Sequence, residues 1–319
     1  MKWVKRIVLV LVALLAAAIA TVVVFFYVLH PKKRDAPDVK APSTPEAIAR
    51  GSYLANHLIG CVGCHTEIDE TRPGDAIVAT KLLAGREFVS DLLPGRIVAS
   101  NLTPDPDTGI GAWTDGELMR AIREGIGKDG RALFPIMPYP HLRRLPDDDT
   151  LAIIAYLRSV PAIRNQLPAT TLDFPVSMFI RLAPAPLDGN PPAWPTEPTE
   201  RGKILLETMG CIDCHTPLDK GKFVESKLYA GGNKFTGPFG TVHASNITSD
   251  PATGIGSYSD DDLMRVFREG KGKDGRTLWV MPWTMFQGTE EADLRALIAG
   301  LRTLRPIPNV VPAPQITKR

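Results

Sequence analysis

An internal repeat limits the folds open to this chain more than any other feature of the sequence. Residues 99–133 match residues 244–278 at an offset of 145, with 23 of 35 positions identical. A match of this length at a fixed offset indicates two copies of one structural unit. The 319 residues also suffice for about two domains. The sequence therefore predicts two similar domains, over residues 46–162 and 199–305.

Helix signals recur at corresponding places in the two copies. Thr114 and Glu117 form a capping box, and Gly125 can end the helix that they open. Ser259 and Gly270 bound the same pattern in the second copy. Amphipathic periodicity and capping residues predict four further helices: from Ser43, over 147–160, over 199–209 and over 290–304. Since no segment shows a strong strand pattern, we expect an all-α fold with long loops.

The first 30 residues are predicted to be a transmembrane anchor. Residues 7–29 carry no charge, and about 20 apolar residues span a bilayer as a helix. Trp3 at one end and Phe25, Phe26 and Tyr27 at the other match interfacial aromatic belts. A cleaved signal peptide is the alternative, because Ala18-Ile19-Ala20 offers a cleavage site. The apolar run continues past that site, which favours a retained anchor.

Prolines and charges complete the organisation. A linker is expected over 31–45, a connector rich in proline over 163–198 and a tail over 306–319. The first 34 residues hold six basic side chains and no acid, so a net charge of +2 leaves 31 − 35 = −4 for the rest. A mildly acidic body argues against nucleic acid as a partner.

All four cysteines lie in two CxxCH motifs. These are Cys61-Val62-Gly63-Cys64-His65 and Cys211-Ile212-Asp213-Cys214-His215. CxxCH is the attachment pattern of c-type haem, because two thiols on one helical turn can form thioethers with one haem while the following imidazole reaches the iron. A zinc site would not require a histidine after each pair, and a thioredoxin-like site would need a βαβ context. The sequence therefore predicts two haem c groups, with His65 and His215 as iron ligands.

Through the two CxxCH motifs and three repeated segments, the sequence resembles the class I-like cytochrome c domains in multihaem subunits of membrane-bound dehydrogenases, such as alcohol and gluconate dehydrogenases. The segments are Ser-Asn-(Leu/Ile)-Thr, Thr-Gly-Ile-Gly and the Met-Pro-aromatic triplets at Met137 and Met281. The resemblance covers most of 46–162 and 199–304. It implies small α-helical haem domains, electron transfer, and haem attachment on the outer side of the cytoplasmic membrane. Unlike the three-haem subunits, this chain has two motifs and an N-terminal anchor.

Met137 and Met281 are the predicted second iron ligands. Each lies in the loop before its closing helix and precedes a stiffening proline, and His/Met ligation raises the potential of a haem. The resemblance points to the same pair. Met119 and Met264 also match, but they lie inside capped helices, where methionine usually packs in a core. Three further candidates lack a counterpart of the same type in the other copy: His141, His243 and Met285.

Several matched polar residues are candidates for hydrogen bonds to the haem propionates, since buried carboxylates need donors. They are Asn101, Trp113 and Arg131 in the first copy and Asn246, Tyr258 and Arg276 in the second. Turn chemistry with a surface arginine is an equally open interpretation. His57, one turn before the first motif, is expected to be a surface helix residue.

The sequence thus predicts a dihaem cytochrome c, anchored by one helix in the bacterial cytoplasmic membrane with its haem domains facing the periplasm. Its expected partners are a dehydrogenase as electron donor and a cytochrome or terminal oxidase as acceptor, and no residue is expected to be catalytic. A dihaem cytochrome c peroxidase is the alternative enzyme, but it needs an exchangeable position on one iron, whereas both copies supply a methionine. A haem-based redox or gas sensor is a third reading, and no signalling domain follows the second copy.

Overall fold

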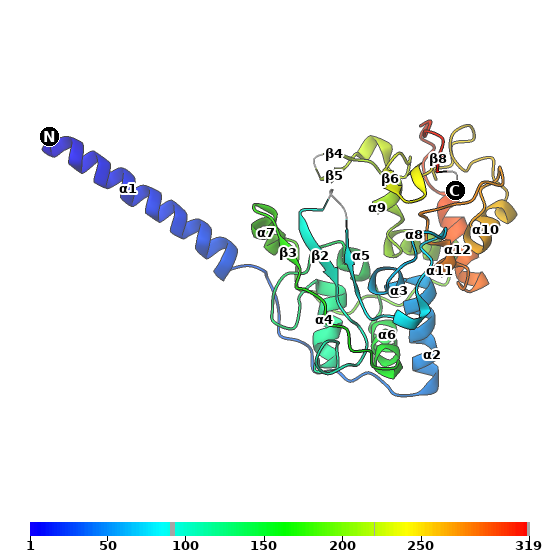
Figure 1. Cartoon of the computed structure of the whole chain (residues 1–319), viewed down its shortest axis with the longest axis horizontal. Helices are drawn as coiled ribbons and strands as arrows, with labels where there is room; N and C mark the ends of the chain where they lie inside the picture. Colours follow the sequence, from blue (N-terminus) through cyan, green and yellow to red (C-terminus); the bar gives the residue numbers. More distant parts are fainter. Residues whose placement is uncertain (90–92, 220, 318–319) are drawn as a thin grey trace.

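The computed structural model describes residues 1–89, 93–219 and 221–317 and contains a long N-terminal helix followed by two helical units (Figure 1). We use "first unit" for the elements from α2 to α6 and "second unit" for those from α8 to α12. Residues 90–92, within the first expected domain, residue 220, within the second, and residues 318–319, the end of the expected tail, lie outside the described residues.

The N-terminal helix consists of α1 (Lys2–Val23), which continues as the π-helical turn η1 (Val24–Val28). Over these 27 residues the most apolar window has a mean hydropathy of 3.2, and none of that window is buried. A helix of this length, at about 1.5 Å per residue, exceeds the thickness of a bilayer core. By length and composition it fits a single-pass anchor or a signal sequence.

Among the residues that the structure describes, each unit contains five α-helices in the same order. In the first unit they are α2 (Pro45–Tyr53), continued by η2 (Leu54–Leu58), then α3 (Cys61–His65), α4 (Asp115–Glu124), α5 (Tyr139–Leu142) and α6 (Asp147–Ser159). In the second unit they are α8 (Pro198–Thr208), α9 (Cys211–His215), α10 (Asp260–Glu269), α11 (Trp283–Phe286) and α12 (Glu291–Arg302). Short 3-10 turns η3 (Ala79–Lys81) and η5 (Glu225–Lys227) follow the CxxCH helices.

The predicted helix ends are largely confirmed. Thr114 and Glu117 form the capping box of α4, and Gly125 follows it with a left-handed φ of 71°. The same features frame α10, where Ser259 pairs with Asp262. The expected start at Ser43 is wrong by one residue, because the side chain of Thr44 accepts the amide of Ala47 and caps α2.

The first and last helices of each unit cross at a glycine. A Cβ atom on Gly51 would lie 1.8 Å from the carbonyl oxygen of Ala152, and one on Gly202 would lie 1.8 Å from that of Ala296. Only a residue without a side chain permits so close an approach of two backbones. These crossings hold α2 against α6 and α8 against α12.

In the described part of the chain, three small antiparallel sheets correct the all-α expectation. One contains β1 (Arg86–Phe88), β2 (Gly95–Ala99) and β3 (Thr171–Leu172); another pairs β4 (Leu218–Asp219) with β5 (Lys222–Phe223); the third contains β6 (Lys234–Gly237), β7 (Gly240–His243) and β8 (Gln315–Ile316). Strands of two to five residues are too short to produce a visible period-2 pattern. The molecule is therefore helix-rich with minor sheets.

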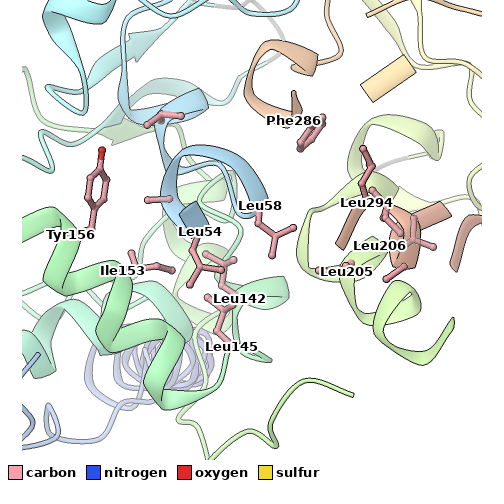
Figure 2. Close-up of a cluster of buried hydrophobic side chains, with 14 of the residues drawn as sticks. Leu54, Leu58, Leu142, Leu145, Ile153, Tyr156, Leu205, Leu206, Phe286 and Leu294 are labelled. Atoms are coloured by element: carbon pink, nitrogen blue, oxygen red, sulfur yellow. The ribbon is translucent and has the colours of Figure 1, made fainter. Parts of the chain in front are cut away.

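A buried apolar cluster contains residues from both units (Figure 2). Its labelled members from the first unit include Leu54, Leu58 and Tyr156, and those from the second include Leu205 and Phe286. The units are thus joined by apolar packing as well as by the connector. The connector itself is pinned, because the indole of Trp194 donates to Asp149 at 2.5 Å.

Candidate functional site

Each CxxCH motif forms a five-residue helix that starts after a left-handed glycine. Gly60 has a φ of 77° and Gly210 a φ of 66°. This conformation, which glycine adopts without strain, turns the chain sharply from the preceding helix into the motif. Both cysteines of each motif then lie on a single turn of α3 or α9, as thioether attachment to one haem requires.

The free thiols are not poised as thiolates. Desolvation raises the pKa of Cys61 to about 12 and that of Cys211 to about 12, and it also raises the pKa of Cys64 and Cys214, although Cys61, Cys64 and Cys211 are only partly buried and Cys214 is exposed. A thioredoxin-like redox site needs a thiolate near neutral pH, so these pKa values do not favour that alternative. Within residues 1–89, 93–219 and 221–317, no three His, Cys, Asp or Glu side chains form a group that could hold a metal ion. That observation does not favour the zinc alternative.

The two motif histidines are oriented in the same way. His65 Nδ1 lies 2.7 Å from the carbonyl oxygen of Ser100, and His215 Nδ1 lies 2.7 Å from that of Ser245. A carbonyl only accepts hydrogen bonds, so Nδ1 carries the proton and Nε2 keeps its lone pair. Burial lowers the pKa of both imidazoles and favours the neutral form, which is the form that binds a metal. The histidines therefore fit the role of iron ligand.

A second repeated loop, which the sequence analysis missed, supports each histidine. The His65 carbonyl accepts the amide of Gly85 at 2.7 Å, and the His215 carbonyl accepts that of Gly231 at 2.8 Å. In these loops Leu83 and Tyr229 have left-handed φ values of 58° and 60°. Strained backbone of this kind is typical of functional sites. The detectable signal was Lys-Leu-x-Ala-Gly, which occurs at 81–85 and again at 227–231.

Met137 and Met281 lie in matched loops and pack, partly buried, against the apolar cluster. The aromatic residue two positions later holds each loop. A Cβ on Gly125 would lie 2.5 Å from the Tyr139 ring, and one on Gly270 would lie 2.2 Å from the Trp283 indole. The C-terminal ends of α4 and α10 therefore pack directly against these rings. By contrast, Met119 is only 2% exposed and belongs to the apolar core.

The side-chain amides of Asn101 and Asn246 form hydrogen bonds with neighbouring loop residues. Asn101 Nδ2 donates to Thr108 Oγ1 at 3.2 Å and to the Ile163 carbonyl at 2.7 Å. Asn246 Nδ2 makes the corresponding bonds to Thr253 and Ile307 at 3.1 and 2.8 Å. Because a side-chain amide has two N–H groups, these bonds use both. The geometry favours a loop-forming role over a propionate contact.

The other propionate candidates lie around the same loops. Arg276 donates to Asp274 at 3.0 Å and to Ser245 Oγ at 3.1 Å, next to the carbonyl that orients His215. Arg131 pairs with Asp129 at 3.4 Å. The two aromatic candidates, Trp113 and Tyr258, pack against the apolar cluster. Of the six candidates, Arg276 is tied most directly to a motif histidine.

The two motifs face the boundary between the units. His141 of α5 lies with Nε2 3.2 Å from both carboxylate oxygens of Asp213, inside the second motif. At the matched position of α11, the sulfur of Met285 packs on the first motif, 3.6 Å from where a Cβ on Gly63 would lie. Each unit thus places one residue of the short helix that follows its methionine loop against the CxxCH helix of the other unit.

Further hydrogen bonds cross this boundary, among them those of His57 and Tyr53. His57 Nδ1 lies 2.9 Å from the carbonyl oxygen of Met285, so the expectation of a surface residue is wrong: the second unit covers that face of the helix. The Tyr53 hydroxyl donates to Asp293 at 2.7 Å and accepts the amide of Glu290 at 3.2 Å. The boundary is therefore a specific polar contact as well as an apolar one.

Paired CxxCH helices, histidines with a free Nε2 and methionine loops define the class of c-type cytochromes. A scan against protein-family models found no match. The chain is 31% identical over 309 residues to the alcohol dehydrogenase (quinone) cytochrome c subunit of Gluconobacter oxydans. It is 30% identical over 302 residues to the fructose dehydrogenase cytochrome subunit of Gluconobacter japonicus, and 32% identical over 229 residues to a diheme cytochrome c-type protein of Cereibacter sphaeroides.

The alignments cover 92%, 91% and 70% of this chain and 60%, 59% and 73% of the respective relatives. The chain belongs to this family of cytochrome c proteins, whose members include cytochrome c subunits of dehydrogenases. It spans about 60% of the length of the two dehydrogenase subunits. Membership implies covalently bound haem c and electron transfer.

Proposed function

We propose that the chain carries single electrons through two covalently bound haem c groups. Cys61 and Cys64 would hold the first group and Cys211 and Cys214 the second. His65 and Met137 would ligate the first iron, and His215 and Met281 the second. Bound haem supplies a reversible one-electron change at iron. The observation that carries the proposal is the matched 2.7 Å contact from each motif histidine to a serine carbonyl.

The protein residues orient the iron ligands. The carbonyls of Ser100 and Ser245 fix the histidine tautomer, and a bonded Nδ1–H makes the other ring nitrogen a better ligand. A thioether sulfur as the second ligand raises the potential. If a histidine and a methionine bind each iron, neither iron would keep a position open for peroxide, which favours electron transfer over the peroxidase reading.

The wider arrangement is part of the same proposal. Two tandem class I-like cytochrome c domains, over 46–162 and 199–305, would follow a retained anchor and face the periplasm. The repeated motifs and the matched helix order support the tandem domains. Because relatives are named as subunits of alcohol, fructose and gluconate dehydrogenases, a dehydrogenase is the proposed donor. A downstream cytochrome or terminal oxidase is the proposed acceptor.

The donor can be tested in membrane vesicles from the source bacterium. Oxygen uptake on ethanol, fructose and gluconate is measured in vesicles from three kinds of cell: cells with the chain, cells without it, and cells carrying the C211S/C214S variant. We expect uptake on one substrate to be lost without the chain, restored by the wild type and not by the variant. Uptake that never depends on the chain would contradict a dehydrogenase donor. Rapid hydrogen peroxide turnover by the purified protein would favour the peroxidase instead.

A further inference from the structure

An apolar segment of the connector is exposed to solvent. Residues 174–182 read Phe-Pro-Val-Ser-Met-Phe-Ile-Arg-Leu and form α7 (Val176–Phe179) and the 3-10 turn η4 (Ile180–Leu182). Phe174, Phe179 and Leu182 are 78%, 52% and 42% exposed. Large apolar side chains grouped in this way indicate an interaction surface. We call Phe174, Phe179 and Leu182 the connector patch.

The connector patch adjoins the end of the N-terminal helix. The Phe179 and Phe26 rings meet edge to face with centroids 5.6 Å apart. Arg181 Nε donates to the Phe26 carbonyl at 2.7 Å, and its guanidinium lies 4.8 Å from the centre of the Tyr27 ring. Figure 1 shows α7 beside the C-terminal end of the long helix. The patch is thus continuous with the last turn of the apolar helix.

The chemistry of this region matches the interfacial layer of a bilayer. Aromatic rings concentrate at headgroup level, and an arginine can lie there with its stem among apolar groups and its charge in water. Phe25, Phe26 and Tyr27 mark that level on the anchor, and Lys32 and Lys33 follow it. Phe179 and Arg181 contact the anchor at this same level.

The patch is also fixed to the first unit. β3, which precedes it, pairs with β2 in the register Gly95↔Leu172, and the Asp173 amide donates to the Pro94 carbonyl at 3.0 Å. A membrane contact made by the patch would therefore orient the first unit on the bilayer. The linker over 31–45 is held on the first unit as well, because Arg34 pairs with Glu124 at 2.8 Å and the Ala41 amide donates to Asp115 at 2.9 Å.

We propose that the connector patch is a second membrane contact, with Phe174, Phe179 and Leu182 entering the headgroup layer beside the anchor. The inference rests on the retained anchor of the proposed function. It sets the first unit next to the bilayer in one fixed orientation. The patch contacts lipid, because it continues the surface of a helix that spans the membrane.

The test uses a photo-crosslinking amino acid, p-benzoylphenylalanine, in the full chain reconstituted in nanodiscs of phosphatidylcholine and phosphatidylglycerol. The residue replaces Phe174 in one variant, Leu15 of the anchor in a second and Val310 of the tail in a third. Leu15 and Val310 are 61% and 83% exposed and Phe174 is 78% exposed, so the protein itself covers none of the three positions. After illumination, phospholipid adducts are counted by mass spectrometry of the protein.

We expect the adduct yield at position 174 to be within a few-fold of that at position 15 and at least about tenfold above that at position 310. A yield at 174 equal to that at 310, or cross-links from 174 only to a second protein chain, would overturn the inference. Absence of lipid adducts at position 15 would contradict the anchor itself, so the two failures are distinguishable.

Discussion

A backbone carbonyl determines what each motif histidine can do. The carbonyl oxygens of Ser100 and Ser245 each lie 2.7 Å from Nδ1 of His65 and His215 and accept its hydrogen bond. The folded protein itself therefore sets the orientation of both imidazoles. The CxxCH motif identifies the two histidines from sequence, but no sequence pattern identifies their carbonyl partners. Those partners lie 35 and 30 residues away and are brought close only by the folded loops.

Replacing Met281 by Ala tests the second ligand of the second iron. Without the thioether we expect one of the two haems to become high-spin, to bind CO when reduced and to show a lower potential. Absorption spectra and a redox titration measure these changes. Met137→Ala is expected to do the same to the other haem.

Met119→Leu is the matched control, because Met119 is buried in the core and an isosteric apolar exchange costs less than about 1.5 kcal/mol. Its spectrum is expected to match the wild type. An unchanged low-spin spectrum in Met281→Ala would exclude Met281 as a ligand.

His141 makes the boundary between the units sensitive to pH. The hydrogen bond with Asp213 raises the pKa of His141; burial opposes the shift, and the charges of Asp213 and Glu207 add to it. Glu207 itself pairs with Arg144 at 2.8 Å. A raised pKa means that the contact stabilises fully below the unfolded value of about 6.5 and is lost as the pH rises through the folded value.

His141→Gln should therefore lower the free energy of unfolding more at about pH 5 than at about pH 8. Since Asp213 is about half exposed, screening limits the difference to about 0.5 kcal/mol. Denaturant titrations at the two pH values measure it, and Asp213→Asn should remove the same dependence. A loss that is equal at both pH values would show that the pair is not ionic.

At the scale of elements, capping signals predict helix ends well because they depend on neighbouring residues. Thr114, Ser259, Gly125 and Gly270 all lie where the sequence places them. The sheets could not be predicted in the same way. β3 and β8 come from the connector and the tail, and they form only by pairing with β2 and β7 of the preceding units. Such pairing depends on long-range contacts, which local patterns do not contain.

Gly270→Ala tests the coupling between a helix end and a methionine loop. The left-handed φ of 62° costs an alanine about 1–2 kcal/mol. The new Cβ would also lie 2.2 Å from Trp283, and overpacking adds about 1–3 kcal/mol. We expect lower stability in denaturant titrations and a weakened sulfur-to-iron absorption band of the second haem.

Gly275→Ala separates strain from contact. Gly275 has a similar φ of 80°, and nothing lies within 4 Å of its added Cβ. This variant is expected to lose only the conformational part of the stability and to keep its sulfur-to-iron band. Equal loss of the band in both variants would contradict the role of Trp283 as a support for Met281.

At the scale of the whole molecule, the repeat predicts two similar units but not their mutual arrangement. The contacts of His57, His141 and Met285 cross the boundary. His141 and Met285 occupy matched positions but differ in type, so comparison of the copies cannot reveal these contacts. The structure brings both CxxCH helices to this boundary. That arrangement suits a relay in which an electron passes between the units.

Tyr53→Phe tests the polar contact between the units. Burial and Asp293 raise the pKa of Tyr53, so the hydroxyl remains protonated and donates to that carboxylate. Its removal also leaves the Glu290 amide without this acceptor. We expect a loss of about 1–2 kcal/mol and faster hydrogen exchange at the start of α12.

Tyr156→Phe provides the matched control, because the Tyr156 hydroxyl bonds Asn56 inside the first unit at 3.0 Å. It should lower stability by a similar amount without changing exchange in α12. If both variants alter α12 equally, the effect is global and the boundary contact is not specific.

The proposed electron transfer depends on two haem c groups in the chain, each ligated by histidine and methionine. The most direct measurement is the haem content of the purified full chain, together with oxidised and reduced absorption spectra recorded with and without CO. We expect two covalent haems per chain, both low-spin, with the sulfur-to-iron band present when oxidised and no change on adding CO. A single haem, or a high-spin haem that binds CO, would contradict the proposal.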